Sequence, residues 1–149
     1  MCIRDRVDPA LLLQDLVENS RRAGQAAHIH RITGSGEALL QPVAINRALE
    51  NLVGNAVRYG SRAELSLSLT PKALVFTVED DGPGIPEAAR DEAMRPFARL
   101  DAARNQNAGG GVGLGLSIAM DIARQHGGIL RLDRSERLGG LKADIVLAR

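Results

Sequence analysis

The sequence predicts an α+β domain, and its hydrophobic pattern leads to that fold class. Helix-like periodicity occurs in three separate stretches, and much of the chain between them alternates apolar and polar residues as strands do. The strand patterns 63–69 and 73–79 are separated by one short turn and predict an antiparallel hairpin, and 129–133 and 142–147 predict a final strand pair. With 149 residues, 44% of them apolar, the chain is about one domain long and can bury a core.

The first two helices are defined by their ends and their apolar faces. Asp8 can cap the first helix and Pro9 suits its first turn, while Gly24 marks its expected end. Residues 42–59 form the clearest helix of the chain, because their apolar side chains cluster on one side at 100° per residue. The apolar faces are Leu11, Leu12, Leu16 and Val17 in the first helix, and Ile45, Leu49, Leu52, Val53 and Ala56 in the second.

A strand is expected between these helices. Residues 28–33 are rich in β-branched side chains and end at a glycine turn, and residues 38–40 are expected to pair back on them. His28 and His30 would then point to one face, as metal ligands can. Because no third ligand is in sight, an exposed strand face is the favoured interpretation.

The second helix carries an unusual polar stripe. Asn51, Asn55 and Arg58 fall together on a side different from the apolar face, with Tyr59 at the edge of the stripe. Asparagine is a poor helix former, so two of them four residues apart lower helix propensity without an obvious structural return. A bound ligand would explain the stripe, and a solvated polar face is the alternative.

The hairpin delivers the chain to a candidate binding residue. The strand 73–79 ends in acidic residues, and Asp81 is followed by a Gly-Pro-Gly turn at 82–84. Such a turn fixes the direction of the acid and lets backbone approach a ligand closely. An acidic surface turn is the alternative. A short helix is expected after Pro86.

A glycine-rich stretch precedes the third helix. Residues 98–111 contain little apolar material, so they predict either a disordered segment or a mobile functional loop. Gly111, Gly113 and Gly115 then lead into a helix that a glycine pair at 127–128 ends, and backbone N–H groups at such a helix start can face an anion. The spacing matches neither a P-loop nor a GxGxxG motif, and close helix packing also selects glycine. The expected buried face of this helix is Leu116, Ile118, Ala119, Ile122 and Ala123.

The composition of the chain limits the kinds of partner and the cellular compartment that we expect. The formal net charge of +1 gives no indication of a nucleic-acid surface, and Cys2 alone cannot form an internal disulfide, which favours the cytoplasm. No apolar run is long enough for a membrane span, so no direct membrane contact is expected. Residues 1–6 show neither helical nor strand periodicity and are interpreted as a non-native segment, so the domain is expected to span 7–149 as part of a longer protein.

Together these features favour a nucleotide site, because an aspartate can accept from the adenine amine and an amide oxygen can bind Mg²⁺. Four motifs occur in order along the chain: Asn51-x-x-x-Asn55-x-x-Arg58-Tyr59, Asp81-Gly82-Pro83-Gly84-Ile85, Arg95-Pro96-Phe97 and Gly111-x-Gly113-Leu114-Gly115-Leu116. They resemble the four boxes of the catalytic, ATP-binding domain of sensor histidine kinases, and the residues around them are similar to those of the osmolarity-sensor type. This resemblance implies a Bergerat fold, a two-layer α/β sandwich with a mixed, mostly antiparallel sheet covered on one face by about three helices.

The resemblance also implies roles. Asp81 would bind the adenine amine, Asn55 the Mg²⁺ ion, Arg58 and Tyr59 the phosphates and the base side, and Arg99 the phosphates from a flexible lid. The full set of ATP-binding residues that it implies is Asn51, Asn55, Arg58, Tyr59, Asp81, Gly84, Ile85, Arg99, Gly111, Gly113, Leu114, Gly115 and Leu116.

Two positions depart from related patterns. ATP-hydrolysing relatives carry a glutamate as general base where this chain has Asn51, and Glu50 lies about 100° around the helix from that position. The resemblance therefore implies transfer of the phosphoryl group to another nucleophile and not to water. Val112 replaces the usual hydroxyl-bearing residue, which puts lid ordering and Mg²⁺ affinity in question.

The expected function is that of a protein-histidine kinase domain which binds Mg-ATP. Its phosphoacceptor histidine would lie on a dimerisation domain absent from this chain, because neither His28 nor His126 sits in the family's acceptor motif. His126 is interpreted as a helix C-terminal residue favoured by the dipole. A response regulator is the expected downstream partner, and the isolated domain is expected to be a monomer in the cytoplasmic part of an inner-membrane sensor. The alternatives are a free-standing anti-sigma-factor serine kinase and a non-catalytic nucleotide-sensing module.

Overall fold

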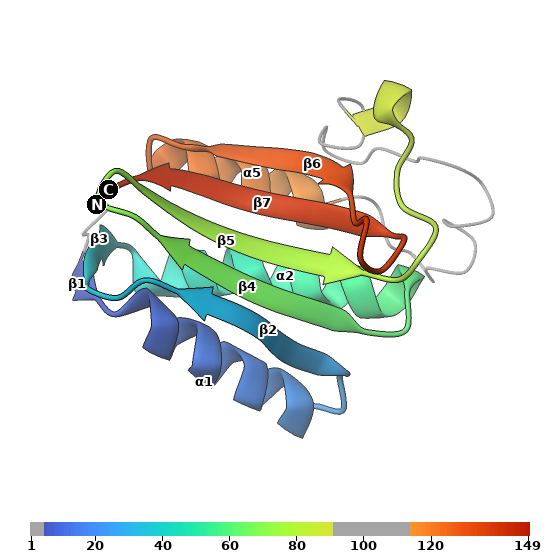
Figure 1. Cartoon of the computed structure of the whole chain (residues 1–149), viewed down its shortest axis with the longest axis horizontal. Coiled ribbons are helices and arrows are strands. Elements are labelled where there is room, and N and C mark those ends of the chain that lie inside the picture. The colour runs from blue at the N-terminus through green and yellow to red at the C-terminus, as the bar shows by residue number, and fades with distance from the viewer. Residues whose placement is uncertain (1–4, 91–113) are drawn as a thin grey trace.

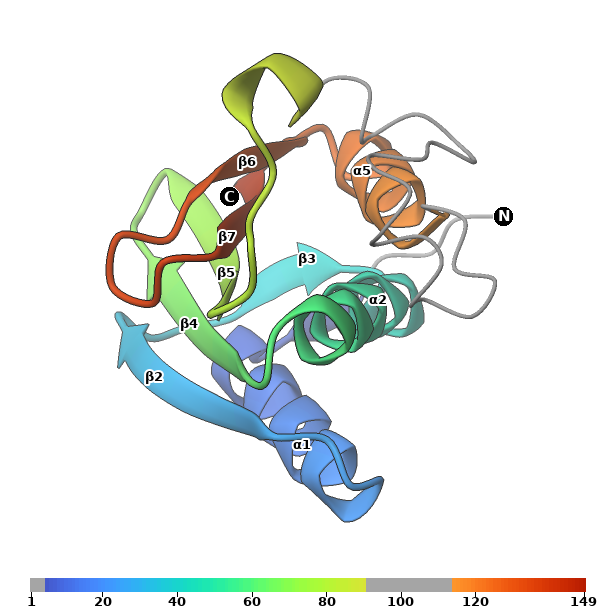
Figure 2. The same cartoon turned by 90° about the vertical axis from the view of Figure 1, so that its right-hand side faces the viewer.

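One mixed sheet and three helices make up the two layers of the molecule in the computed structural model, which describes residues 5–90 and 114–149 (Figures 1 and 2). The strand order is β2-β4-β5-β7-β6; β2 pairs with β4 in parallel, and the other hydrogen-bonded neighbours in this sheet pair antiparallel. The helices all cover the same face, which confirms the expected α+β sandwich (Figure 2). The elements are α1 Pro9–Arg22, β2 Ala27–Thr33, α2 Pro42–Tyr59, β4 Ala63–Leu69, β5 Ala73–Asp80, α5 Leu114–Gln125, β6 Ile129–Arg134 and β7 Leu141–Ala148.

A separate two-stranded ribbon corrects one expectation. β3 (Ala38–Leu40) pairs antiparallel with β1 (Asp5–Val7), and it does not pair back on β2. The reason lies in the connection, where Gly34 and Gly36 adopt left-handed backbone conformations and turn the chain away from the sheet edge. β2 instead pairs with β4, a partner distant in sequence. Asp5 and Arg6, which show no strand pattern in the sequence, are therefore part of β1.

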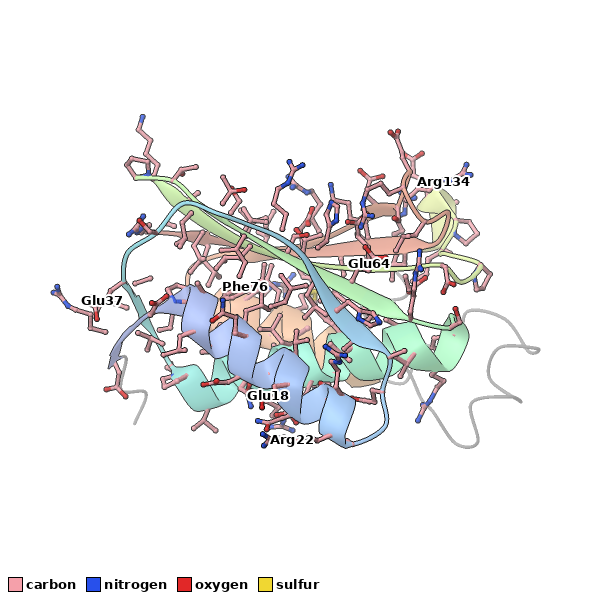
Figure 3. All side chains as sticks on the ribbon, turned by 60° about the horizontal axis from the view of Figure 1, so that its bottom comes forward. Glu18, Arg22, Glu37, Glu64, Phe76 and Arg134 are labelled. Carbon is pink, nitrogen blue, oxygen red and sulfur yellow. The ribbon has the colours of Figure 1, made fainter. Side chains whose placement is uncertain are left out.

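Side chains between the two layers form a single core. Alternate residues of β4 and β5 point into it, as the period of two requires, and Leu65, Leu67 and Phe76 are almost completely buried. Leu49 of α2 is equally buried from the other layer. In Figure 3 Phe76 lies between the sheet and the helices, whereas Glu64 lies on the opposite face of the sheet.

The helix ends follow the sequence rules. Asp8 caps α1, because its Oδ1 accepts from the N–H groups of Ala10 at 3.0 Å and Leu11 at 3.4 Å. His126, just after α5, is buried and plays a different part from the one expected. Its Nε2 accepts the N–H of Gln41, the N-cap of α2, at 3.1 Å, while Nδ1 lies 2.8 Å from the carbonyl of Ile122. A ring that accepts at Nε2 is neutral, so His126 connects two helices instead of offsetting a dipole as a cation.

The C-terminus of α2, the end of β5 and the start of α5 lie on the same side of the molecule. α2 leads through a short link into β4, which is antiparallel to β5, so the C-terminus of α2 lies beside the end of β5. α5 leads through Gly127 into β6, which runs parallel to β5, so the start of α5 reaches the same side (Figure 1). The helices of the described ranges are all too short or too polar to cross a bilayer.

Candidate functional site

The end of β5 presents two neighbouring aspartates to opposite sides of the sheet. Asp80 has the same parity as Leu74, Phe76 and Val78, which point into the core, and it is 5% exposed. Asp81 follows the strand and is exposed. The two carboxylates therefore lie in different environments although they are adjacent in sequence.

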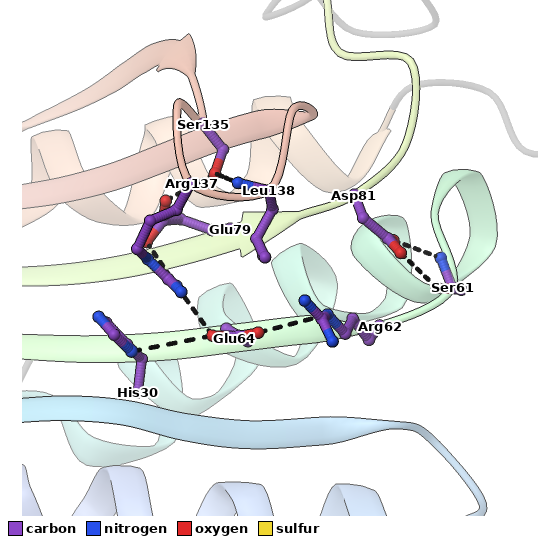
Figure 4. A network of polar contacts seen from close by, with 9 residues as sticks. All are labelled: His30, Ser61, Arg62, Glu64, Glu79, Asp81, Ser135, Arg137 and Leu138. Carbon is purple, nitrogen blue, oxygen red and sulfur yellow. Dashed lines mark hydrogen bonds and ion pairs between the residues drawn. The ribbon is translucent and has the colours of Figure 1, made fainter.

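Asp81 is attached to the segment that follows α2. Its Oδ1 accepts the N–H of Ser61 at 2.7 Å, and its Oδ2 accepts the hydroxyl of Ser61 (Figure 4). The hydroxyl, followed by the backbone N–H, lowers the pKa of the Asp81 carboxyl below its ordinary value. Asp81 thus holds the end of β5 to the end of α2.

On the helix-covered side of the sheet, backbone N–H groups hold the side chain of Asp80 in place. Its Oδ1 accepts from the N–H of Gly82 at 2.9 Å and from the N–H of Leu141 at 3.1 Å. Gly140 passes so close that a Cβ atom on it would overlap the Asp80 carboxylate and carbonyl. A buried carboxylate held in one direction by backbone donors is a stronger candidate ligand group than the exposed Asp81. The parity of the core residues of β5 was the pattern that could have identified Asp80 from the sequence.

The polar stripe of α2 lies beside this strand end only at its C-terminal residue, Tyr59, whereas Asn51 lines a pocket between α1 and α2. Asn51, Asn55 and Tyr59 are half-buried, and Arg58 is exposed. The backbone of α2 approaches the turn after β5 so closely that a Cβ on residue 82 would stand 2.6 Å from the carbonyl oxygen of Tyr59. Gly82 is therefore required for this contact. Two of the sequence motifs thus meet in space.

The turn continues past Gly84 into a pocket. Gly84 has a φ of +72°, which glycine tolerates, and Ile85 is buried against the core. Arg90, after the 3₁₀ helix η1 (Glu87–Ala89), donates from Nε to the carbonyl of Ile85 at 3.2 Å. The pocket has a volume of about 290 Å³ and is lined by Pro83, Gly84, Ile85, Pro86, Arg90, Arg134, Gly139 and Gly140.

The start of α5 is the last described part of the candidate site. Leu114 and Gly115 lie in the first turn of the helix, and the side chain of Leu116 is buried in the core. Among the described residues, no group of three or more histidine, cysteine or acidic side chains could hold a metal ion. The remaining expected site residues, Arg99, Gly111 and Gly113, lie outside the described residues, as do Arg95-Pro96-Phe97 and Val112.

The uncovered face of the sheet carries a charged network behind the site (Figure 4). Arg137 donates to Glu64 at 2.8 Å and to Glu79 at 3.3 Å, and Glu79 also accepts the hydroxyl of Ser135 at 2.7 Å. Partial burial acts to raise the pKa of Glu64, but the hydrogen bond and charge of Arg137, helped by Arg62 and His30, lower it below the ordinary value. Glu79 is thus occupied by structural contacts.

Comparison with known proteins shows the family. Residues 40–148 match the model of the histidine kinase-, DNA gyrase B- and HSP90-like ATPases. The chain belongs to this family. It is 39% identical over 145 residues to the sensor histidine kinase GtrS of Pseudomonas aeruginosa, and this alignment covers 97% of the chain and 29% of the relative. It is 34% identical over 137 residues to the sensor histidine kinase CpxA of Escherichia coli, covering 91% of the chain and 30% of the relative.

Solved structures agree with the fold. The histidine kinase domain of the E. coli osmosensor EnvZ superposes with a TM-score of 0.73 at 35% identity, over 99% of this chain and 90% of that one. The ATP-binding domain of PrrB from Mycobacterium tuberculosis gives a TM-score of 0.79 at 23% identity, over 97% and 96% of the two chains. The chain therefore corresponds to the ATP-binding catalytic domain of two-component sensor histidine kinases, as the motifs predicted, and spans under a third of the GtrS and CpxA sequences.

Proposed function

We propose that this domain binds Mg-ATP and donates the γ-phosphoryl group to a histidine on a dimerisation domain outside this chain. The observation that carries the proposal is the meeting of three elements at one end of a histidine-kinase fold: the C-terminal end of α2, the acidic end of β5 and the start of α5. In the transfer, the bond between the γ-phosphorus and the β,γ-bridging oxygen breaks, a phosphorus–nitrogen bond forms, and ADP leaves.

The polar residues of α2 are suited to binding Mg²⁺ and to phosphoryl transfer without hydrolysis. Asn55 is half-buried and offers an amide oxygen, and Mg²⁺ bound to a nucleotide needs few protein ligands because phosphates and waters supply the others. The ion would neutralise charge on the phosphates. Asn51, one turn earlier, cannot accept a proton, so it supports transfer to a partner and not hydrolysis. Arg58 and Tyr59 would contact the phosphates and the base side, with Arg99, Gly111 and Gly113 contributing from the lid.

For the adenine amine, Asp81 is the prediction from the sequence, and the geometry favours Asp80. The amine needs an acceptor of fixed direction inside the site, and Asp80 is the buried carboxylate on the helix-covered side. Asp81 accepts from Ser61 through both of its oxygens, Oδ1 from the N–H and Oδ2 from the hydroxyl. The donors of Gly82 and Leu141, in contrast, both reach Oδ1 of Asp80. Gly84, Ile85, Leu114, Gly115 and Leu116 would shape the walls around the nucleotide.

The biological setting is part of the proposal. The relatives named sensor histidine kinases are more than three times as long as the chain, so we place the domain in the cytoplasmic part of an inner-membrane sensor. A response regulator would receive the phosphoryl group from the dimerisation domain. The isolated catalytic domain is expected to be a monomer.

The test combines the purified domain with Mg-ATP labelled at the γ-phosphate and the separately produced dimerisation domain of GtrS or CpxA. Acid-labile, base-stable label on the acceptor histidine is expected, and an acceptor with that histidine replaced is the control. Acid-stable label on serine would favour a serine kinase. Tight ATP binding without transfer to either acceptor domain would favour a nucleotide-sensing module.

A further inference from the structure

Two consecutive residues of β5 contact the same loop from opposite faces of the sheet. On the open face, Glu79 accepts the hydroxyl of Ser135. On the helix-covered face, Asp80 accepts the N–H of Leu141. Asp80 also lies so close to Gly140 that a side chain at residue 140 would overlap it. The loop 135–140 between β6 and β7 is therefore attached to both sides of the strand end that carries the proposed adenine acceptor.

Ser135 is the centre of this loop. It is 0% exposed, and its Oγ both donates to Glu79 and accepts the N–H of Leu138 at 3.2 Å. Its backbone N–H donates to the carbonyl of Gly140 at 2.8 Å, and its carbonyl accepts the N–H of Gly139 at 2.6 Å. One buried residue thus closes the loop on itself and fastens it to β5.

Arg137 extends from the same loop across two strands. Glu64 and Glu79 are directly opposite each other on β4 and β5, where two carboxylates would repel. Arg137 donates to both and offsets the repulsion between them (Figure 4). The loop is consequently held by a hydrogen bond and by two ion pairs, all on the face away from the nucleotide.

The position of the loop 135–140 affects the Asp80 carboxylate through the backbone of Gly140 and Leu141. Leu141, one residue beyond the loop, supplies an N–H group that fixes the Asp80 carboxylate, and Gly140 packs directly against that carboxylate. A small displacement of the loop would move this donor and this packing contact together, and recognition geometry is sensitive to shifts of about 1 Å.

We propose that Ser135 and Arg137 are positioning residues for adenine recognition, which hold the loop 135–140 from the open face of the sheet and thereby orient Asp80 on the other face. This inference rests on the proposed binding of ATP with Asp80 as the acceptor for the amine. It assigns a ligand-specific role to residues that do not touch the nucleotide.

The test measures the dissociation constants of ATP and of inosine triphosphate, which lacks the exocyclic amine, for the wild-type chain and for Ser135→Ala, Arg137→Ala and Arg137→Lys. The ratio of the two constants reports amine recognition, because a general loss of stability or phosphate binding lowers both affinities alike. We expect Ser135→Ala and Arg137→Ala to reduce the preference for ATP by about threefold to tenfold. Arg137→Lys should restore part of it, since the charge is kept.

Arg131→Ala is the matched control. Arg131 also pairs with a buried carboxylate on the open face, at 3.0 Å from Asp144, but Asp144 pairs in register with Thr77, further from the strand end. This variant should lose stability and keep the wild-type ratio. An unchanged ratio in both Ser135→Ala and Arg137→Ala, with Asp80→Asn abolishing the preference, would overturn the inference and leave the proposed function standing. Failure of the wild-type chain to bind ATP would refute both.

Discussion

Gly140 and Asp80 are in such close contact that residue 140 cannot carry a side chain without displacing the carboxylate. We expect Gly140→Ala to lower the free energy of unfolding by about 1–3 kcal/mol, as overpacking does, and to weaken ATP binding as well. Chemical denaturation and calorimetry would measure the two effects. In Gly54→Ala the new methyl group meets no other described residue within 4 Å, so helix propensity should dominate and raise stability by about 0.5–1 kcal/mol. Equal losses in both variants would contradict the steric explanation.

Substitution of the two aspartates separates their roles. Asp80→Asn keeps an oxygen for the N–H groups of Gly82 and Leu141 but removes the carboxylate, so ATP affinity should fall about 10- to 100-fold with the fold intact. Asp81→Asn can still accept from Ser61 N–H and should bind ATP within about threefold of the wild-type chain. Binding titrations of both variants decide, and the reverse order of effects would restore Asp81 as the adenine acceptor.

Local patterns account for what the sequence could predict. The cap at Asp8, the β4–β5 hairpin and the end of α5 shortly before Gly127 each depend on neighbours in the chain, and all three are observed. The parallel pairing of β2 with β4 depends on a partner more than thirty residues away, which no local pattern contains.

The site shows the same limit. The motif residues of α2 and β5 could be selected from the sequence, but a shift of one residue exchanges the buried and the exposed side of a strand. A shift of one residue is also the difference between the buried Asp80 and the exposed Asp81, so the motif alone does not decide between the two aspartates. The link between Glu79 and Ser135 joins residues 56 positions apart, and no spacing rule could have found it.

The metal role of Asn55 predicts a dependence on Mg²⁺. Asn55→Ala should weaken ATP binding about tenfold with Mg²⁺ present and hardly at all in EDTA, because the lost amide oxygen acts through the ion. Arg58→Ala is the matched comparison, since a direct cation–phosphate contact should be lost under both conditions. Titration calorimetry with and without metal gives the four affinities. A loss for Asn55→Ala that is equal in EDTA would remove Asn55 from the metal site.

The Glu64–Arg137 pair predicts how stability changes with pH. The folded pKa of Glu64 lies below the ordinary 4.5, so its contribution is present above that pH and is lost as pH falls through the folded pKa. The stability difference between the wild-type chain and Arg137→Ala should therefore be constant near pH 7 and narrow below about pH 4.5. Urea unfolding from pH 7 to pH 3 would follow it. Repeating the comparison in a Glu64→Gln background should remove that part of the change, and a difference constant down to pH 3 would exclude the pair as its source.

The buried ring of His126 predicts a loss of stability that exposed histidines do not share. His126→Ala leaves the N–H of Gln41 at the start of α2 without its acceptor and opens a cavity at the end of α5, so the free energy of unfolding should fall by about 2–4 kcal/mol. His28→Ala, on the exposed part of β2, should change it by less than about 0.5 kcal/mol. Thermal and urea unfolding of the two variants provide the comparison. Since the ring accepts at Nε2, His126→Lys should not rescue stability, and rescue by this cation would instead support an interaction with the helix dipole.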